Sequence, residues 1–480
     1  MPYSKLSKGF LEALRSIVGP QHVLCGTQIT EDYQRDELAE DLFCPEAVVV
    51  PESTEQVSQL LQWAFEHNVP VTTRGSGTGL CGGSVAVEGG IVLSTARMNQ
   101  ILEVDQQNLM AVVQPGVILM EFQKFVEDQG LFYPPDPGEK TATLGGNVST
   151  NAGGMRAVKY GVTRDYVIGL EAVLADGTVI ETGGKVVKNS SGYSLNHLLI
   201  GSEGTLAVIT KLTLKLLPKP EKQISLLVPF PSLREAIETV PRILAAKVVP
   251  TAIEFLQREV LEAAEKYLGK QFPDSSAPAY LLLTFYGQNV VELESVYEKT
   301  AHVCLDAGAI DVLIANSPDR QESIWQTRGA FLEALKAMSA LEEVDVVVPP
   351  SEIAAFVQFT KDLEAELEAR ILSFGHAGDG NLHVYILQDE LPKDEWQRRA
   401  HQAMDAMYAR AKQLRGQVSG EHGIGYAKRP YLRSSLGAAQ MQLMRGIKDV
   451  FDPKGILNPG KVWSPSAADS VKLEESNWMH

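Results

Sequence analysis

Two short glycine-rich motifs near the C-terminus bring imidazole and carboxylate groups close together in the chain. The first motif, GHAGDGNLH, ends at His383, and the second, SGEHGIG, ends at Gly425. They contain three of the nine histidines, His376, His383 and His422, together with the carboxylate of Glu421. Imidazole and carboxylate groups bind borderline divalent metals such as zinc, iron or manganese. A fourth group left over from such a ligand set could move a proton.

The glycines of the first motif predict how its two histidines meet. His376 and His383 are seven residues apart and would face opposite sides of an unbroken strand. The intervening glycines disfavour a helix. A tight turn at Gly378-Asp379-Gly380 would instead bring both rings inward. The alternative is a pair of ordinary core histidines, but the nearby Glu-His motif favours a site.

Two further glycine-rich segments lie in the N-terminal half. The segment 74–84 reads RGSGTGLCGGS, and TATLGGNVSTNAGG lies within a region, 134–161, that is predicted to be a long functional loop. The first segment lies between strands, which is wrong for a Rossmann turn, and it lacks the Lys-Ser/Thr ending of a P-loop. Consecutive small residues still let backbone N–H groups converge on an anion. A simple turn is the alternative, but two such segments suggest a long ligand that carries a pyrophosphate.

Composition limits the class of protein. A chain of 480 residues is longer than a single hydrophobic core usually organises, so at least two domains are expected. The formal net charge of −17 argues against nucleic acid as a partner. No apolar run is long enough to span a membrane, and the N-terminus lacks the pattern of a signal peptide. The four cysteines include no CxxC pair, which disfavours an iron–sulfur cluster and a zinc knuckle, and their sparseness is typical of a reducing cytosol.

Periodicity and turn residues predict an α+β fold with an antiparallel sheet in its second part. In the first part, helices are expected over residues 5–18, 54–67 and 120–129, and strands over 47–50, 69–73, 91–94, 101–105, 110–114, 167–174, 179–182 and 206–217. Beyond the prolines at 218 and 220, strands and helices alternate, a long helix covers 318–341, and later helices cover 395–415 and 441–451. The predicted domains are 1–220, with its core at about 43–218, then 221–415, a C-terminal return over 416–464, and a loose tail over 465–480.

Several motifs together resemble a known flavoprotein family. RGSGTGL, the PDP…LGGNVSTNAGG…KYG segment, GSEGTL and NPGK resemble the flavin-binding signature of the vanillyl-alcohol oxidase / p-cresol methylhydroxylase fold. GHAGDGNLH and SGEHGIG resemble the FAD-linked 2-hydroxyacid dehydrogenases. That family includes D-lactate dehydrogenase, the glycolate oxidase flavin subunit and D-2-hydroxyglutarate dehydrogenase. The motifs follow in order from about residue 40 to residue 462.

The resemblance implies a p-cresol methylhydroxylase-type FAD-binding domain, a substrate domain and the residues that hold FAD. The backbone amides of Gly75, Ser76, Gly77, Thr78 and Gly79 would hold its pyrophosphate. The residues expected to line the flavin or lie near it are Pro137, Gly145, Gly146, Ser149, Gly154, Gly161 and Ile209, and Asn458 would close the C-terminal return onto the cofactor. The first loop has no histidine that could tether FAD, so non-covalent binding is expected, with Cys81 as an unlinked core residue.

The resemblance also divides the C-terminal motifs between two roles. His376, His383 and Glu421 would bind a divalent metal, and His422 would lie against the substrate as a base. A 2-hydroxy acid can chelate such a metal through its carboxylate and hydroxyl, which lowers the pKa of the hydroxyl. An imidazole with an ordinary pKa near 6.5 suits removal of that proton. The α-hydrogen would then leave as hydride to FAD and give a 2-keto acid.

Arg328 is the candidate for binding the substrate carboxylate. A guanidinium matches carboxylate geometry in a bidentate way, although an ordinary surface arginine is the alternative. Residues 329–333 and 342–345 are apolar or acidic, which favours a monocarboxylate such as D-lactate or glycolate over D-2-hydroxyglutarate. Two less favoured functions are a metal-free flavin oxidase of sugar-like alcohols and a non-catalytic flavin subunit that relays electrons.

The partners of the chain are predicted only by class. A quinone, a cytochrome, an electron-transferring flavoprotein or an iron–sulfur partner subunit would take electrons from reduced FAD, and oxygen is disfavoured by analogy with the family. A cytoplasmic location is expected. A homodimer and attachment at the inner membrane face are left open.

Overall fold

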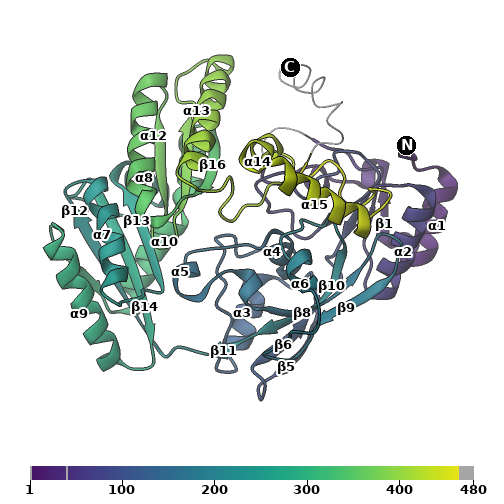
Figure 1. Cartoon of the computed structure of the whole chain (residues 1–480), viewed down its shortest axis with the longest axis horizontal. Helices are drawn as coiled ribbons and strands as arrows, with labels where there is room; N and C mark the ends of the chain where they lie inside the picture. Colours follow the sequence, from purple (N-terminus) through teal and green to yellow (C-terminus); the bar gives the residue numbers. More distant parts are fainter. Residues whose placement is uncertain (1–2, 39–41, 464–480) are drawn as a thin grey trace. The chain divides into compact units, whose positions relative to one another are not determined.

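The computed structural model describes residues 3–38 and 42–463 and divides the chain into two compact units (Figure 1). The first unit comprises the chain up to Ala152, then Val162–Lys219, and the chain from His422 onward. The second comprises Gly153–Gly161 and Pro220–Glu421. The predicted loose tail, 465–480, lies outside the described residues. Among the described residues, no helix combines the length and the apolar character needed to cross a membrane.

The first unit contains a small mixed sheet and an antiparallel sheet. The mixed sheet has the order β1-β2-β4-β3, formed by Val23–Cys25, Ala47–Val49, Ile91–Ser94 and Val71–Arg74, with β2, β4 and β3 parallel. The second sheet is antiparallel in the order β5-β6-β10-β8-β9, formed by Ile101–Asp105, Met110–Val113, Val208–Lys215, Val167–Val173 and Val179–Gly183. Helices α1 (Lys8–Val18) and α2 (Thr54–His67) contribute apolar side chains to a core that both sheets share.

The predicted long loop over 134–161 is partly helical, which corrects that expectation. Helix α4 spans Leu144–Thr150 and α5 spans Ala157–Tyr160. The hydroxyl of Thr143 accepts a hydrogen bond from the Gly146 N–H and so caps α4. Low apolar periodicity hid these helices because they are short, and tertiary contacts rather than an amphipathic face support them.

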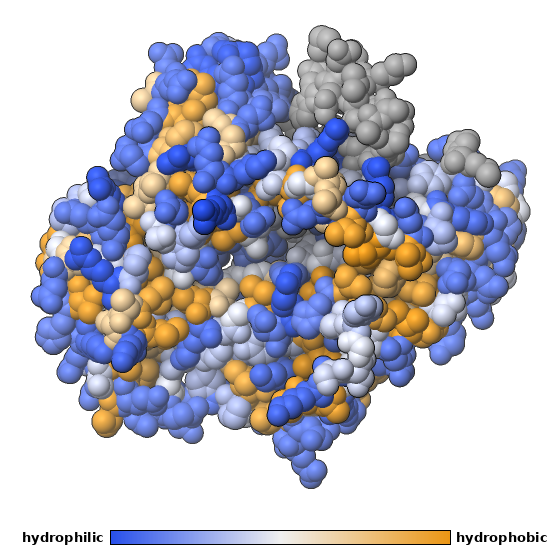
Figure 2. Space-filling view, in the orientation of Figure 1, coloured by the Kyte–Doolittle hydropathy of each residue, from blue (hydrophilic) through white to orange (hydrophobic). Residues whose placement is uncertain are grey.

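The C-terminal segment packs into the first unit through buried polar groups. The Lys448 ammonium, on α15 (Ala438–Phe451), donates to the carbonyls of Thr205 and Leu457. By contrast, Leu443 and Val450 on the same helix are 69% and 80% exposed. Figure 2 shows hydrophobic residues on the surface in the region of α15. The helix is thus attached through its lysine and presents apolar side chains to solvent.

The second unit is built on one seven-stranded antiparallel sheet in the order β15-β12-β14-β13-β17-β18-β16. Its strands are β12 (Lys222–Phe230), β13 (Ala252–Gln257), β14 (Ala279–Gly287), β15 (Leu313–Ala315), β16 (Leu341–Val347), β17 (Ile371–His376) and β18 (Asn381–Leu387). Helices α7 (Leu233–Ala245), α9 (Val290–Asp306), α12 (Ile353–Leu367) and α13 (Lys393–Gln413) pack against this sheet and against one another, and α8 (Arg258–Leu268) packs in the apolar cluster that contains Phe374 and Tyr385.

The single long helix predicted over 318–341 is helical as far as residue 338, but it is broken after Gly329 and ends before Leu341. Two helices replace it, α10 (Pro318–Gly329) and α11 (Phe331–Met338), and Leu341 begins strand β16. The break follows Gly329, and glycine disfavours helix interiors. The valines of β16 and the residues after it favour an extended chain, because β-branched residues suit strands.

Two boundaries differ from the expected domains. The stretch Gly153–Gly161 belongs to the second unit, because a Cβ on Gly378 would lie 2.7 Å from Val158 and the Lys159 ammonium donates to the Tyr286 carbonyl at 3.3 Å. The C-terminal return begins at His422 rather than at residue 416, because Gln417 pairs with Val347 at the end of β16.

Candidate functional site

The two glycine-rich segments of the first unit lie against each other. The Ser76 hydroxyl donates to the carbonyl of Thr141 at 2.8 Å. A Cβ on Gly75 would lie 2.2 Å from the Thr143 hydroxyl oxygen, so only glycine fits there. Gly77 has φ +77°, in the region that glycine tolerates. This close backbone approach is the feature that the two segments need to hold a dinucleotide together, and it fits FAD.

The other residues predicted to bind the cofactor are spread over both units. Gly154 and Gly161 lie in the second unit, and Pro137, Gly145, Gly146, Ser149, Ile209, Asn458 and the Gly75–Gly79 loop lie in the first. The Asn458 amide donates to the carbonyls of Gly83 and Glu203 at 2.8 and 2.7 Å. Its side chain therefore joins the C-terminal return to the glycine-rich loop. Cys81 is buried, in agreement with its expected place in the core.

The register of the β17–β18 hairpin brings His376 and His383 together, as the glycine turn predicts. Phe374 pairs with His383 across the hairpin, and His376 lies two residues along the same strand as Phe374. Residues two apart on a strand share a face, so both imidazoles lie on one face of the sheet. Their ring centroids are 5.3 Å apart and the rings are perpendicular. Both side chains are buried.

The carboxylate of Glu421 completes this cluster within the second unit. Its Oε1 lies 3.4 Å from Nε2 of His376 and 3.3 Å from Nε2 of His383. One ligand atom from each of the three residues lies within 4.8 Å of the other two. A Cβ on Gly153 would lie 2.8 Å from Oε2 of Glu421, so the Gly153–Gly161 stretch also borders the cluster. Two imidazoles and one carboxylate are the donors that a borderline divalent metal takes, so this cluster fits one.

A further carboxylate, Glu254 on β13, lies behind His376. Its Oε1 accepts a hydrogen bond from Nδ1 of His376 at 2.6 Å. Its Oε2 accepts from Nε of Arg328 at 2.8 Å and lies 2.6 Å from one terminal nitrogen of that guanidinium. Glu254 is fully buried. Two nitrogens of the Arg328 guanidinium thus contact a single oxygen of a protein carboxylate, and the guanidinium also covers the Phe374 ring at 4.7 Å.

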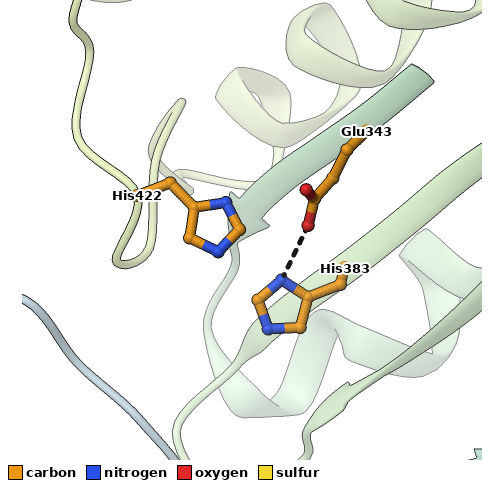
Figure 3. Close-up of side chains that lie close together, drawn as sticks. All are labelled: Glu343, His383 and His422. Atoms are coloured by element: carbon orange, nitrogen blue, oxygen red, sulfur yellow. Dashed lines mark ion pairs between the residues drawn. The ribbon is translucent and has the colours of Figure 1, made fainter. Parts of the chain in front are cut away.

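His383 has an equivalent carboxylate on β16. Figure 3 shows Glu343 with its Oε1 directed at Nδ1 of His383, and the two atoms are 3.6 Å apart. The Tyr385 hydroxyl donates to the same oxygen at 2.9 Å. Each imidazole therefore has a carboxylate near Nδ1 and has Nε2 directed at Glu421. This is how metal-binding histidines are commonly oriented in proteins.

The charges in the cluster shift its pKa values. Burial alone would lower the pKa of His376, but Glu254 and Glu421 raise it well above its usual value. Burial would likewise raise the pKa of Glu421, but its hydrogen bonds with His376 and His383 hold it well below the usual range. The pKa of Glu254 is also lowered, because the charges of His376 and Arg328 outweigh its burial. The cluster therefore favours positive charge at its centre.

The sequence named His422 and the three ligand candidates as site residues but did not reveal the carboxylates that lie near the two imidazoles. His422 follows Glu421 directly and begins the part of the chain assigned to the first unit. Glu254 is the only charged residue of strand β13, and Glu343 and Asp345 alternate with Val344 on β16. A lone charged residue in an otherwise apolar strand indicates a buried polar site, because a buried carboxylate requires partners. Their identification still required the strand register.

Comparison with protein families gives two matches in order along the chain. Residues 45–183 match an FAD binding domain, and residues 219–462 match the C-terminal domain of FAD linked oxidases. A solved structure of p-cresol methylhydroxylase with substrate bound aligns with a TM-score of 0.78 and 18% identity over 96% of this chain and 98% of its own. At that identity the likeness concerns the fold, and it confirms the predicted p-cresol methylhydroxylase-type architecture.

Curated relatives match nearly the whole chain. D-lactate dehydrogenase of Anaerostipes hadrus is 48% identical over 96% of this chain and 98% of its own length. Glycolate oxidase subunit GlcD of Bacillus subtilis is 42% identical, with 98% and 100% covered. D-2-hydroxyglutarate dehydrogenase of Stutzerimonas stutzeri is 33% identical, with 95% and 98% covered.

Proposed function

We propose that this chain, which belongs to the family of FAD-linked oxidoreductases that includes D-lactate dehydrogenase and glycolate oxidase subunit GlcD, oxidises a D-2-hydroxy monocarboxylate to the 2-keto acid. D-lactate and glycolate are the favoured substrates. We further propose that a divalent metal takes part, held by His376, His383 and Glu421. The observation that carries the metal proposal is the orientation of the two imidazoles, each with a carboxylate near Nδ1 and with Nε2 directed at Glu421.

The role proposed for each residue follows from the chemistry of its side chain. When bound, a divalent metal would lower the pKa of the hydroxyl on C2 of the substrate. FAD would accept the hydride from C2. His376 and His383 can offer Nε2 as a neutral ligand atom if the proton stays on Nδ1, where the carboxylates of Glu254 and Glu343 lie. His422 would take the proton of the C2 hydroxyl on a ring nitrogen, and the carbon that bears this hydroxyl becomes the keto carbon.

The substrate class is inferred from the side chains around Arg328. Two of its nitrogens contact Glu254, so one terminal nitrogen remains to bind a substrate carboxylate. The carboxylate of Glu343, 3.6 Å from Nδ1 of the candidate ligand His383, would repel a second substrate carboxylate at the cluster. Both observations favour a monocarboxylate. D-2-hydroxyglutarate is kept as the second candidate because of the 33% identical relative that is named for it.

Electron transfer beyond FAD is proposed only by class. Quinone, cytochrome, electron-transferring flavoprotein and an iron–sulfur partner subunit remain the candidate acceptors, and the relative named as a subunit supports a partner protein. We also propose non-covalent binding of FAD and a cytoplasmic location. Attachment at the inner membrane face and a homodimer are left open.

Anaerobic mixing of the purified flavoprotein with substrate tests this function. D-lactate or glycolate is expected to bleach the absorbance of oxidised flavin. Removal of metal with a chelator should abolish bleaching, and added Zn²⁺, Mn²⁺ or Fe²⁺ should restore it. Replacement of His422 by alanine should slow bleaching by roughly 10²- to 10⁴-fold, the usual contribution of a general base.

Three results would contradict parts of the proposal. Full-rate bleaching by protein whose metal content has been measured as nil would exclude the metal. An unchanged rate in the His422→Ala variant would exclude this residue as the base. A higher kcat/KM for D-2-hydroxyglutarate than for both monocarboxylates would replace the favoured substrate with the second candidate.

A further inference from the structure

We infer that Asp345 and Glu203 are positioning residues that hold the two ends of the segment Ser419–Gly425. The segment contains Glu421 and His422, so the inference rests on the proposed function. The chain passes from the second unit to the first between these two residues. Each end of the segment is held by a buried carboxylate from its own unit.

Asp345 holds the first end. It is fully buried on β16. Its Oδ2 accepts hydrogen bonds from the Ser419 hydroxyl at 2.7 Å, from the Gly420 N–H at 3.1 Å and from the Glu421 N–H at 3.3 Å. Its Oδ1 accepts from the Asn381 amide at 2.7 Å. A buried carboxylate is stable only with such donors, and here most of them come from the segment that presents Glu421.

The same contacts fix the segment against the histidine hairpin. Asn381 is the first residue of β18, and its amide also donates to the Val346 carbonyl at 3.1 Å. A Cβ on Gly420 would lie 2.2 Å from the Asn381 amide nitrogen, so the backbone reaches Asp345 only because residue 420 is glycine. Asp345 therefore links strand β16, the hairpin that carries His383 and the backbone of Glu421.

Glu203 holds the second end. Its Oε1 accepts from the Ile424 N–H at 2.8 Å and its Oε2 accepts from the Gly425 N–H at 2.7 Å. Its own backbone is fixed, because its N–H donates to Ser149 and its carbonyl accepts from Asn458. Gly423 has φ +81°, and a Cβ there would lie 3.2 Å from the Glu203 carboxylate. Ile424 and Gly425, two and three residues after His422, are thus held by hydrogen bonds to one carboxylate.

The two carboxylates should have separable effects. Asp345 accepts from the backbone N–H of Glu421 itself, so its loss should displace a metal ligand. The Glu203 carboxylate accepts from Ile424 and Gly425, which follow His422, so its loss should displace the base and leave the ligands in place. If both residues only stabilised the fold, their loss would not affect the metal ligand and the base separately.

The test compares the isosteric variants Asp345→Asn and Glu203→Gln as purified holoenzymes. In each variant the new side-chain NH₂ group takes the place of a carboxylate oxygen. It therefore faces at least one backbone N–H that donates to that oxygen in the wild type. For Asp345→Asn we expect metal affinity, measured by competition with a chromogenic chelator, to fall roughly 10- to 100-fold. Flavin content should be unchanged. For Glu203→Gln we expect metal content to be unchanged, and the limiting rate of flavin reduction to fall by about 10²-fold, the cost of a misplaced group.

Matched controls exist in each unit. Asp274→Asn removes a carboxylate that accepts from the Tyr280 hydroxyl and the Ser276 N–H, in the second unit. Asp452→Asn removes a buried carboxylate that accepts from the Ile456 and Leu457 N–H groups, in the first unit. Both controls should lower the melting temperature without a change in metal affinity or reduction rate. The milder variant Ser419→Ala should weaken metal binding in the same direction if Asp345→Asn fails to fold.

The outcomes separate this inference from the proposed function. If the wild-type protein reduces flavin without metal, the proposed function fails. If the wild type requires metal but Asp345→Asn and Ser419→Ala retain wild-type metal affinity, the role of Asp345 is contradicted. If Glu203→Gln reduces flavin at the wild-type rate, or if added metal restores its rate, the role of Glu203 is contradicted.

Discussion

The carboxylate of Glu254 lies 2.6 Å from Nδ1 of His376, in the buried interior of the second unit. The same carboxylate accepts from Arg328, so one fully buried charge is shared between a metal-ligand candidate and the arginine expected at the substrate. A buried carboxylate without partners is costly, and here both partners can carry positive charge. Glu254 thus couples the orientation of His376 to that of Arg328.

Replacement of Glu254 by glutamine should weaken both contacts. Metal affinity is expected to fall roughly 10- to 100-fold, because the imidazole loses the carboxylate that orients it. The free energy of unfolding should fall by about 3–5 kcal/mol, because the Arg328 charge stays buried without an opposite charge. Chelator competition and urea denaturation measure the two effects. Glu262→Gln, which removes an exposed partner of Arg258, is the control and should alter neither quantity by more than about 1 kcal/mol.

Arg328→Lys tests whether the arginine also binds substrate. Lysine keeps the charge but cannot contact Glu254 at two points while also offering a nitrogen to a substrate. We expect KM for D-lactate to rise roughly 10- to 100-fold, equivalent to one charge-assisted hydrogen bond, with a smaller change in kcat. Steady-state kinetics with an artificial electron acceptor measure both constants. Arg258→Lys is the control, since Arg258 also forms ion pairs, here with Glu262 and Glu265, and lies outside the cluster. An unchanged KM with a lowered melting temperature would make Arg328 purely structural.

Lys461 should make stability depend on pH in the alkaline range. Burial lowers its pKa from the ordinary 10.5 to about 7. Between these values the unfolded chain binds more protons than the folded protein, so the free energy of unfolding rises as pH rises through that window. Lys461→Met should lack this rise. The difference in melting temperature, wild type minus variant, is therefore expected to increase between about pH 7 and about pH 9.5. A flat or shrinking difference would contradict the prediction, and Lys454→Met, at an exposed lysine, is the control.

The sequence was most informative where turn chemistry and local pattern agree. Helix α2 begins after the capping hydroxyl of Ser53 and ends at Asn68 in the left-handed conformation, and its bounds match the prediction. The glycine turn after His376 predicted that the two imidazoles meet, and the hairpin confirms it. Strand β16 was missed, because the predicted helix ran to its first residue and no strand was predicted over 342–347.

The parts of the site that the sequence did not reveal depend on strand register. Glu254 pairs with His376 across β13 and β17, although 122 positions separate them in the chain. Asp345 pairs with His383 across β16 and β18. No local pattern encodes which strands are neighbours, so these carboxylates could be recognised as buried charges but not assigned to a histidine. The ligand motifs were recognisable because glycines mark them.

Gly75→Ala should specifically impair flavin binding. The added Cβ would lie 2.2 Å from the Thr143 hydroxyl oxygen, so the two glycine-rich segments of the first unit would have to separate. The flavin content of the purified protein, measured from the ratio of visible to ultraviolet absorbance, should fall severalfold, while the metal affinity of the proposed cluster in the second unit should stay unchanged. Gly138→Ala is the matched control, because a Cβ there meets no atom within 4 Å. Wild-type flavin content in the Gly75→Ala variant would show that the close contact at Thr143 does not serve cofactor binding.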